Sequence, residues 1–183
     1  MQKVKLSSFN NDGYNPGAGI GKRLLWHICS LVYFESKLWL PYSLKRFLLR
    51  MFGASVGKGV VIKPSVQIKY PWKLTVGDYA WIGEHVWIDN LDQVTIGDHA
   101  CISQGAMFLT GNHDYSKFSF DLIVKPIAVE EGAWIGAKAT VTQGVVIGSH
   151  SLLTVGSIAS KDLPRYSICK GNPAEKIKER VVE

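Results

Sequence analysis

The sequence predicts an all-β solenoid, in which the chain winds into three-sided coils, with helices before the coils and a short helix after them. Three observations support this fold class. An aliphatic residue returns every six positions through most of the chain, a small or β-branched residue follows four positions after most of these, and the hexapeptides group in threes. A period of six fits neither an amphipathic helix nor an alternating strand. It fits a prism with one short strand on each side.

The two repeating positions have different roles in such a prism. The aliphatic side chain fills the axis, the small residue fits the crowded corner, and glycine relieves the turn. Trp72, Asp92 and Asn112 break the small-residue pattern, and each belongs to every third hexapeptide. The axial residues are Val56, Ile62, Ile68, Val76, Ile82, Ile88, Ile96, Ile102, Phe108, Val129, Ile135, Val141, Ile147 and Leu153. The corner residues are Val60, Val66, Ala80, Val86, Ala100, Ala106, Ala133, Ala139, Val145, Ser151 and Ser157.

The composition is typical of one compact domain with an appendage. The chain has 183 residues, of which 46% are hydrophobic. Its three cysteines, Cys29, Cys101 and Cys169, form no CxxC motif and argue against a disulfide framework. Residues 1–16 are polar, unlike a signal peptide, and the apolar stretch Leu24–Phe34 is too short to span a bilayer. We therefore expect a cytoplasmic protein.

The formal net charge of +6 indicates an acidic partner. Nucleic acid, an anionic membrane and a phosphate-bearing small molecule all meet this condition. The sequence contains no zinc-finger spacing, aromatic RNA-binding motif or helix-turn-helix pattern, so we expect no nucleic-acid partner. The charge alone does not distinguish the other two.

The chain before the repeat divides into a polar arm, residues 1–21, and an amphipathic segment, residues 22–53. The segment predicts two helices that are split at Pro41, the second ending at Gly53. Because the first coil leaves strand edges unpaired, one interpretation is a helical cap. The other is a peripheral membrane contact, with aromatic side chains inserted and basic side chains on anionic head groups. The residues of the second interpretation are Trp26, Phe34, Trp39, Lys22, Arg23, Lys37, Lys45, Arg46 and Arg50.

Three stretches of the chain, "GKGVVIKPSVQIKYPWKLTVGDYAWIGEHVWIDNL", "CISQGAMFLTGNHDYS" and "SKDLPRYSICKGNPAEKIKER", resemble the hexapeptide-repeat acetyltransferases. The similarity extends from Lys22 to Arg180 and is greatest to the colanic acid and exopolysaccharide branch, which is related to the maltose and galactoside O-acetyltransferases. It implies a left-handed parallel β-helix over residues 54–160 and a homotrimer with active sites between subunits. It also implies acetyl-CoA as the donor and a saccharide acceptor, with a role in envelope or exported polysaccharide biosynthesis at the inner face of the membrane.

Residues 111–127 interrupt the repeat and display His113 beside Asp114 in the stretch "TGNHDYS". Because Gly, Asn and Asp favour turns, the loop alone is also compatible with a plain turn. A neutral imidazole can accept the proton of an alcohol, and a carboxylate or carbonyl on its other nitrogen would fix the tautomer. The resemblance implies that His113 is the general base of a direct transfer without an acyl-enzyme. Asp114 is the candidate that orients it.

By the same resemblance, the donor lies along the later coils. Ser160 and Lys161 match a Thr-Lys pair of the family, which implies that Lys161 approaches the nucleotide phosphates. The coil itself also requires small residues at the positions expected to contact the pantetheine arm. Those positions are Gly136, Ala137, Val155 and Gly156.

The tail, residues 161–183, contains the stretch "GNPAEKIKER". It predicts a short helix with Asn172 as the N-cap and Pro173 at the first position. Its basic side chains suit the 3′-phosphate of the donor, and a solvated basic tail is the other interpretation. These side chains are Lys176, Lys178 and Arg180.

The stretch "EHVWIDN" is the candidate for binding the acceptor. His85 matches an acceptor-binding Asn of the galactoside-type relatives, and Asp89 and Asn90 follow it. Carboxylates and amides suit sugar hydroxyls because they form paired hydrogen bonds. Trp81 or Trp87 would stack on a sugar face or fill the trimer interface.

Three other interpretations stay open. A metal-dependent hydratase can share the β-helix, but the five histidines include no HxxxxH spacing, so we expect no metal site. A non-catalytic trimeric scaffold would not need His113. An acyltransferase for another acceptor, such as an antibiotic or a nucleotide-sugar amine, would have the same coils. The sequence does not determine the sugar, the hydroxyl, a lipid linkage of the acceptor or the selectivity for the acyl chain.

Overall fold

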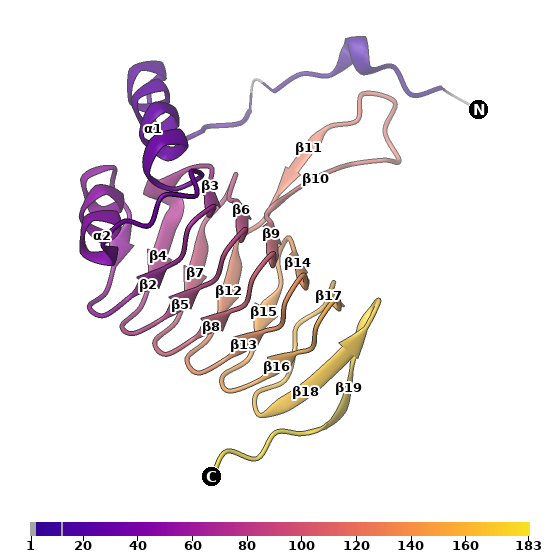
Figure 1. Cartoon of the computed structure of the whole chain (residues 1–183). Coiled ribbons are helices and arrows are strands. Elements are labelled where there is room, and N and C mark those ends of the chain that lie inside the picture. Colours follow the sequence, from indigo (N-terminus) through magenta and orange to yellow (C-terminus); the bar gives the residue numbers. More distant parts are fainter. Residues whose placement is uncertain (1–2, 12) are drawn as a thin grey trace.

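The computed structural model describes residues 3–11 and 13–183, and it confirms the predicted solenoid (Figure 1). Three parallel sheets form the sides of the prism, and the chain passes from the first to the second to the third sheet in each coil. The helices α1 (Ile20–Tyr33) and α2 (Tyr42–Met51) lie at the start of the coils, as the sequence predicted. The two short 3₁₀ helices are η1 (Leu6–Ser8) and η2 (Pro71–Lys73).

The strands of the three sheets are two to six residues long and follow one another in a fixed rotation. The first sheet contains β1 (Ser55–Val56), β4 (Leu74–Val76), β7 (Val94–Ile96), β12 (Ile127–Val129) and β15 (Val146–Ile147). The second contains β2 (Val61–Ile62), β5 (Trp81–Ile82), β8 (Cys101–Ile102), β13 (Trp134–Ile135), β16 (Leu152–Leu153), β18 (Ser167–Gly171) and β19 (Ala174–Glu179). The third contains β3 (Gln67–Ile68), β6 (Trp87–Asp89), β9 (Met107–Leu109), β14 (Thr140–Thr142) and β17 (Ile158–Ala159).

The interior of the prism is the core, and the axial residues that the repeat predicted lie in it. All the predicted axial residues are buried, with Val56 the most accessible at 6%. The predicted corner residues are buried as well. Gly77 illustrates why a corner takes glycine, because an added Cβ would lie 2.6 Å from the backbone nitrogen of Asp98 in the next coil.

The helices cap the first coil through their basic side chains. On α2, Lys45 donates from Nζ to the Lys63 carbonyl at 2.9 Å, and Arg46 donates from Nη1 to the Val60 carbonyl at 2.8 Å. Arg50 donates to the Val56 carbonyl from Nε at 2.8 Å. These bonds satisfy carbonyl groups that have no preceding coil to pair with, which supports the cap interpretation.

The cap also corrects part of the membrane interpretation. Trp26 is buried and donates from Nε1 to the Ile68 carbonyl at 2.8 Å, and Phe34 is fully buried against it. Lys45 is also buried. These three side chains belong to the core of the cap, so they do not contact a membrane. Trp39 remains exposed.

The predicted C-terminal helix is wrong. Residues 174–179 form β19, which pairs antiparallel with β18 after a turn that contains Gly171 at φ +108°. β18 itself pairs parallel with β16, so the solenoid extends beyond the predicted limit at residue 160. The free edge of β18 offers backbone partners to the following residues, and this pairing overrides their local preference for a helix.

We expect the buried amine of Lys45 to make stability depend on pH. Burial lowers the pKa of Lys45 from 10.5 to about 8. Between these two values the unfolded chain binds one proton more than the folded chain, so the free energy of unfolding rises with pH. Wild type should therefore gain stability relative to Lys45→Met as the pH is raised from about 8 towards about 10. Urea denaturation of both proteins across this range measures the difference, and a constant difference would contradict the assignment.

Candidate active site

A hairpin interrupts the solenoid at the corner between the third and first sheets. It consists of β10 (Gly111–His113) and β11 (Leu122–Val124), which are antiparallel and place His113 opposite Leu122 (Figure 1). The N-terminal arm runs beside it, and the Lys5 N–H donates to the Phe118 carbonyl at 2.9 Å. The predicted loop is therefore an ordered hairpin, except that its last residue, Ile127, begins β12.

His113 is held by Phe120, from the far side of the hairpin. Its Nδ1 lies 2.8 Å from the Phe120 carbonyl, which can only accept a hydrogen bond. The imidazole stacks on the Phe120 ring with centroids 4.3 Å apart and an interplanar angle of 7°. Phe9 of the arm packs on it at 5.5 Å. This carbonyl fixes the proton on Nδ1 and leaves the Nε2 lone pair to accept another proton.

Asp114 does not orient the histidine, which corrects the prediction. Its Oδ1 accepts hydrogen bonds from the backbone N–H and the hydroxyl of Ser116. These bonds lower the pKa of the Asp114 carboxyl. The carboxylate therefore stabilises the tip of the hairpin. The partner of the imidazole is the other predicted alternative, a backbone carbonyl, which Phe120 supplies.

His113 lines a cavity of about 590 Å³ between the hairpin and the N-terminal arm. The arm supplies Phe9 and Tyr14, and α1 supplies Arg23. The corner after β3 supplies Lys69 and Tyr70. We call this space the histidine cavity. It combines aromatic faces, two cations and an imidazole, which is a suitable lining for a small polar substrate.

The arm is held over this cavity by hydrogen bonds to the solenoid corner. The Tyr14 hydroxyl donates to the Leu91 carbonyl at 2.8 Å, and burial raises the pKa of that phenol. Trp72 donates from Nε1 to the Pro16 carbonyl at 2.6 Å. The arm is therefore part of the site, although its polar sequence did not indicate this.

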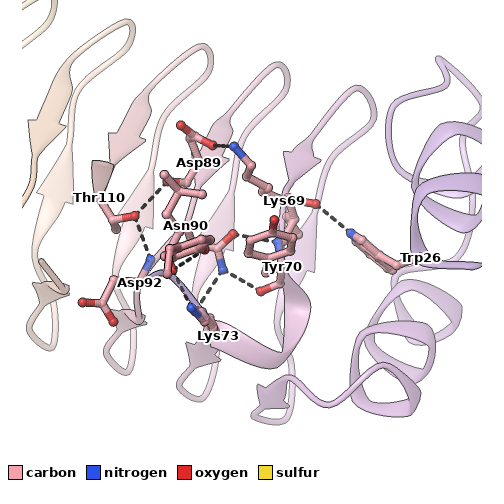
Figure 2. Close-up of polar contacts among 11 residues, drawn as sticks. Trp26, Lys69, Tyr70, Lys73, Asp89, Asn90, Asp92 and Thr110 are labelled. Carbon is pink, nitrogen blue, oxygen red and sulfur yellow. Dashed lines mark hydrogen bonds and ion pairs between the residues drawn. The ribbon is translucent and has the colours of Figure 1, made fainter. Parts of the chain in front are cut away.

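Asn90 is a structural residue, which corrects its assignment to the acceptor (Figure 2). It is 0% exposed. Its Oδ1 accepts from the Tyr70 N–H at 2.9 Å, and its Nδ2 donates to the carbonyls of Tyr70 at 2.6 Å and Lys73 at 2.9 Å. The amide thus joins two successive coils at the corner; both of its N–H donors are used, and its burial keeps it from a sugar hydroxyl.

Asp89 is the last residue of β6 in the third sheet, and His85 lies in the turn two residues before that strand. Asp89 Oδ1 accepts a hydrogen bond from Lys69 Nζ at 2.8 Å (Figure 2), and Lys69 lines the histidine cavity. His85 is exposed at the corner between the second and third sheets, with φ of +58°. One chain therefore does not bring His85 together with Asp89 and His113.

A second cleft, of about 380 Å³, lies at the corner between the second and third sheets. Gly136, Ala137 and Val155 line it together with Trp134, so the predicted donor positions do converge. A Cβ at Gly136 would lie 2.6 Å from the Val155 nitrogen, so the coil requires glycine here for packing alone. Gly156 adjoins this cleft, which we call the corner cleft, and its N–H donates to the Ala137 carbonyl at 2.9 Å.

The other predicted donor residues are distributed unevenly around the corner cleft. Lys178 on β19 is in register with Ile168 and Leu152, and Leu152 lines the cleft. Neighbours in register point to the same face of a sheet, which directs Lys178 towards the cleft side. Ser160 and Lys161 are exposed after β17 and lie outside the cleft lining.

Arg180 has a structural role in one chain. Its Nη1 lies within hydrogen-bonding distance of the carbonyls of Gly132, at 3.2 Å, and of His150 and Ser151, at 3.1 Å each. The guanidinium therefore fastens the tail to the corner between the first and second sheets. This location argues against the predicted contact with the 3′-phosphate.

The histidine cavity and the corner cleft stand at different corners of the same prism. The third sheet separates them, because His113 follows β9 and the cleft residues Ala137 and Val155 precede β14 and β17. Within the described residues, no three His, Cys, Asp or Glu side chains are grouped so that they could hold a metal ion.

Comparisons with known proteins now place the chain in a family. No family model matches it. It is 42% identical over 180 residues to an Escherichia coli K12 protein, WcaF, whose name assigns it as a colanic acid biosynthesis acetyltransferase; the match covers 96% of this chain and 97% of that protein. The chain belongs to the hexapeptide-repeat acetyltransferases. It is therefore an acyltransferase, as the resemblance implied.

Two further relatives agree with this family. Galactoside O-acetyltransferase of Escherichia coli K12 is 28% identical over 135 residues, covering 72% of this chain and 66% of that protein. The solved structure of the hexapeptide-repeat acetyltransferase VCA0836 from Vibrio cholerae matches with a TM-score of 0.79 at 26% identity, over 88% of this chain and 92% of that one. A complex of the same acetyltransferase with acetyl coenzyme A matches with a TM-score of 0.78 at 25% identity, over 88% of each chain.

Sequence reasoning did not assign Lys69 and Tyr70, which line the histidine cavity, although the repeat contained a signal for their corner. Trp72, Asp92 and Asn112, the exceptions to the small-residue pattern, all follow strands of the third sheet and precede the first. They mark the corner at which the histidine cavity lies. Lys69 and Tyr70 precede Trp72, the first of these exceptions. The breaks in the small-residue pattern were therefore the signal that could have identified this corner.

Proposed function

We propose that the enzyme transfers the acetyl group of acetyl-CoA directly to a hydroxyl group of a saccharide, with His113 as the general base. The observation that carries this proposal is the hydrogen bond between His113 Nδ1 and the Phe120 carbonyl. It holds the imidazole in the tautomer whose Nε2 can accept the proton of an alcohol. The similarity to the galactoside enzyme supports a sugar hydroxyl as the acceptor.

The chain's own groups perform three tasks in this reaction. The thioester of the donor is already activated for attack, so the remaining difficulty is the weak nucleophilicity of an alcohol. His113 removes the hydroxyl proton as the new C–O bond forms and returns it to the departing thiolate. The Phe120 carbonyl stabilises the imidazolium that exists between these two proton transfers, and the stacked ring of Phe120 and the tilted ring of Phe9 restrict its rotation.

The chemical character of the corner cleft suits acetyl-CoA. The cleft is lined by small residues beside the backbone of successive coils, which lets an extended chain such as pantetheine approach peptide groups closely. Lys178 supplies a cation on the same face of the second sheet for a phosphate group. We propose Gly136, Ala137, Val155 and Gly156 as the contacts of the pantetheine arm.

The biological acceptor belongs to polysaccharide synthesis. The relative that shares 42% of its residues over nearly the whole chain is named for colanic acid biosynthesis, which supports a glycan acceptor of an exported polysaccharide. Amines are better nucleophiles than alcohols, so an amine acceptor would depend less on a general base than an alcohol does.

We expect His113→Ala to reduce turnover by roughly 10²–10⁴ while leaving the binding of acetyl-CoA unchanged, because a general base contributes about this factor. Asp114→Asn is the matched control, since that carboxylate bonds only within the hairpin, and it should keep most of the activity. Turnover is followed by release of coenzyme A with saccharide acceptors, and donor binding by calorimetry. Normal turnover in His113→Ala would refute the assignment and favour a non-catalytic role for the hairpin.

The active unit is a homotrimer in this proposal. One chain holds the histidine cavity and the corner cleft at different corners, so a complete site requires a second copy whose corner cleft faces His113. Trp81, Trp87 and Trp134 are exposed on the outer faces of the second and third sheets, where a neighbouring prism would cover them.

Mixing two inactive chains tests this arrangement. His113→Ala lacks the base, and Val155→Trp fills the corner cleft from an exposed position. With equal co-expression, about one quarter of the sites between subunits combine an intact His113 with an intact cleft, so about one quarter of wild-type activity should return. Each variant alone is the control. Mixed assemblies without activity would show that both half-sites act within one chain.

The first helix supports a peripheral membrane contact, which we include in the proposal. Within the described part of the chain, no helix is long and apolar enough to cross a bilayer. The face of α1 opposite Trp26 is nevertheless apolar and exposed. A basic protein with an amphipathic helix of this kind fits the surface of an anionic bilayer. The face consists of Ile20, Leu24, Leu25, Ile28, Leu31 and Val32.

We expect the double substitution Leu25→Ser and Ile28→Ser to reduce flotation with vesicles that contain phosphatidylglycerol. Both side chains are more than half exposed and outside the cap core, so folding should be retained. Val181→Ser with Val182→Ser removes exposed apolar groups at the other end of the chain and serves as the control. Equal flotation of all three proteins would exclude the α1 face as a membrane contact.

A further inference from the structure

Arg23 is a cation in the histidine cavity whose guanidinium has no acceptor among the residues that the structure describes. It lies on the first turn of α1 and lines the same cavity as His113. Among the described residues no side-chain or backbone acceptor bonds its guanidinium, and its Nε is buried without an acceptor. A buried donor that bonds nothing is costly, and more so when it is charged. A ligand group is therefore the natural partner of this side chain.

The acidic side chains around Arg23 are already engaged. Asp89 contacts Lys69 Nζ at 2.8 Å. Glu35 accepts a hydrogen bond from the Ser30 hydroxyl at 2.8 Å. Neither forms an ion pair with Arg23, so no carboxylate in residues 3–11 and 13–183 compensates its positive charge. The charge is therefore available to an anion that enters from the cavity.

Arg23 also stands at a junction of two spaces. A neighbouring cavity of about 440 Å³ shares Arg23, Lys69 and Tyr70 with the histidine cavity. Ile20 and Leu24, from the exposed apolar face of α1, line this second space. A ligand group at Arg23 would thus have the imidazole on one side and an apolar helix face on the other.

We infer that the acceptor carries an anionic group, which binds Arg23 while the hydroxyl to be acetylated lies at His113. This inference rests on the proposed function and specifies its substrate class. Carboxylate and phosphate oxygens match the paired N–H groups of a guanidinium. Two sources supply such a group, namely the carboxylate of an acidic sugar and a phosphate that joins a sugar to a lipid. A lipid linkage would continue towards Ile20 and Leu24.

The test compares matched acceptors and matched variants. The acceptors are the neutral methyl glycosides, the uronates and the 1-phosphates of glucose and galactose, together with their short prenyl diphosphate conjugates. The variants are Arg23→Gln, Arg23→Lys and, as a control that removes the neighbouring charge, Lys22→Gln. Acceptor binding is followed by tryptophan fluorescence independently of turnover, and acetyl-CoA binding confirms that each variant is folded. Steady-state kinetics give KM and kcat for each pair.

Wild type should bind at least one anionic series more tightly than its neutral counterpart. Arg23→Gln should raise KM for that series by about 10- to 100-fold, as the loss of a charge-assisted hydrogen bond predicts, with little change in kcat. Arg23→Lys should restore part of the loss, and Lys22→Gln should have little effect. A preference for uronates over phosphates, or the reverse, identifies the source of the anion.

Other results would overturn the inference without ambiguity. Equal effects of Arg23→Gln on neutral and anionic acceptors would refute the inference, and so would a wild type without preference for an anionic series. If acetyl transfer to neutral saccharides were still observed, the proposed function would stand. Binding of anionic sugars at Arg23 without any acetyl transfer would uphold the anion site and refute the saccharide acetyltransferase. Absence of binding for every series would refute the anion site itself.

Discussion

The hydrogen bonds between stacked coils determine most of this structure. Each coil donates and accepts along its whole backbone, as in the bonds from Val61 to Ala80 at 3.0 Å and from Trp81 to Ala100 at 2.9 Å. A coil without a neighbour would leave these groups unpaired, so both ends of the solenoid must be closed. Basic side chains of α2 close the first coil. The β18–β19 hairpin and Arg180 close the last, which explains why this tail is a strand and an anchor.

The same constraint explains where chemistry can be added. Residues in the ladder cannot be inserted or removed without shifting every later bond, whereas a corner lies outside the ladder. The hairpin that holds His113 leaves the chain at such a corner, and β12 still pairs with β7 in register, Ile127 with Val94. Asn90 stabilises the corner one coil earlier by bonding to Tyr70 and Lys73. An insertion with a reactive imidazole is therefore compatible with an unchanged core.

The sequence was sufficient for the core and for locating the hairpin that holds His113, the proposed base, and insufficient for the groups around it. A period of six residues is set by the geometry of the prism, so the repeating axial positions could be read directly. Asp114 and Asn90 were assigned from their chemistry and their neighbours in sequence, yet hydrogen bonds to Ser116 and to Tyr70 use their polar atoms. The tail was predicted as a helix because its local residues favour one, whereas the decisive factor was the free edge of β18. Such long-range pairing has no local signal.

The rigidity of the prism also bears on how this enzyme selects its substrates. The proposed donor positions belong to the coils themselves, where small residues such as Gly136 are required by packing, so they can change little without loss of the fold. The lining of the histidine cavity comes instead from the arm, from α1 and from the exceptional corner, none of which maintains the axial core. Acceptor selectivity can therefore diverge among relatives that share the same coils, through residues such as Tyr14 and Arg23. In the proposed trimer each half-site would also be constrained separately, because the donor positions of one chain are limited by coil packing and the cavity lining of the next chain is not.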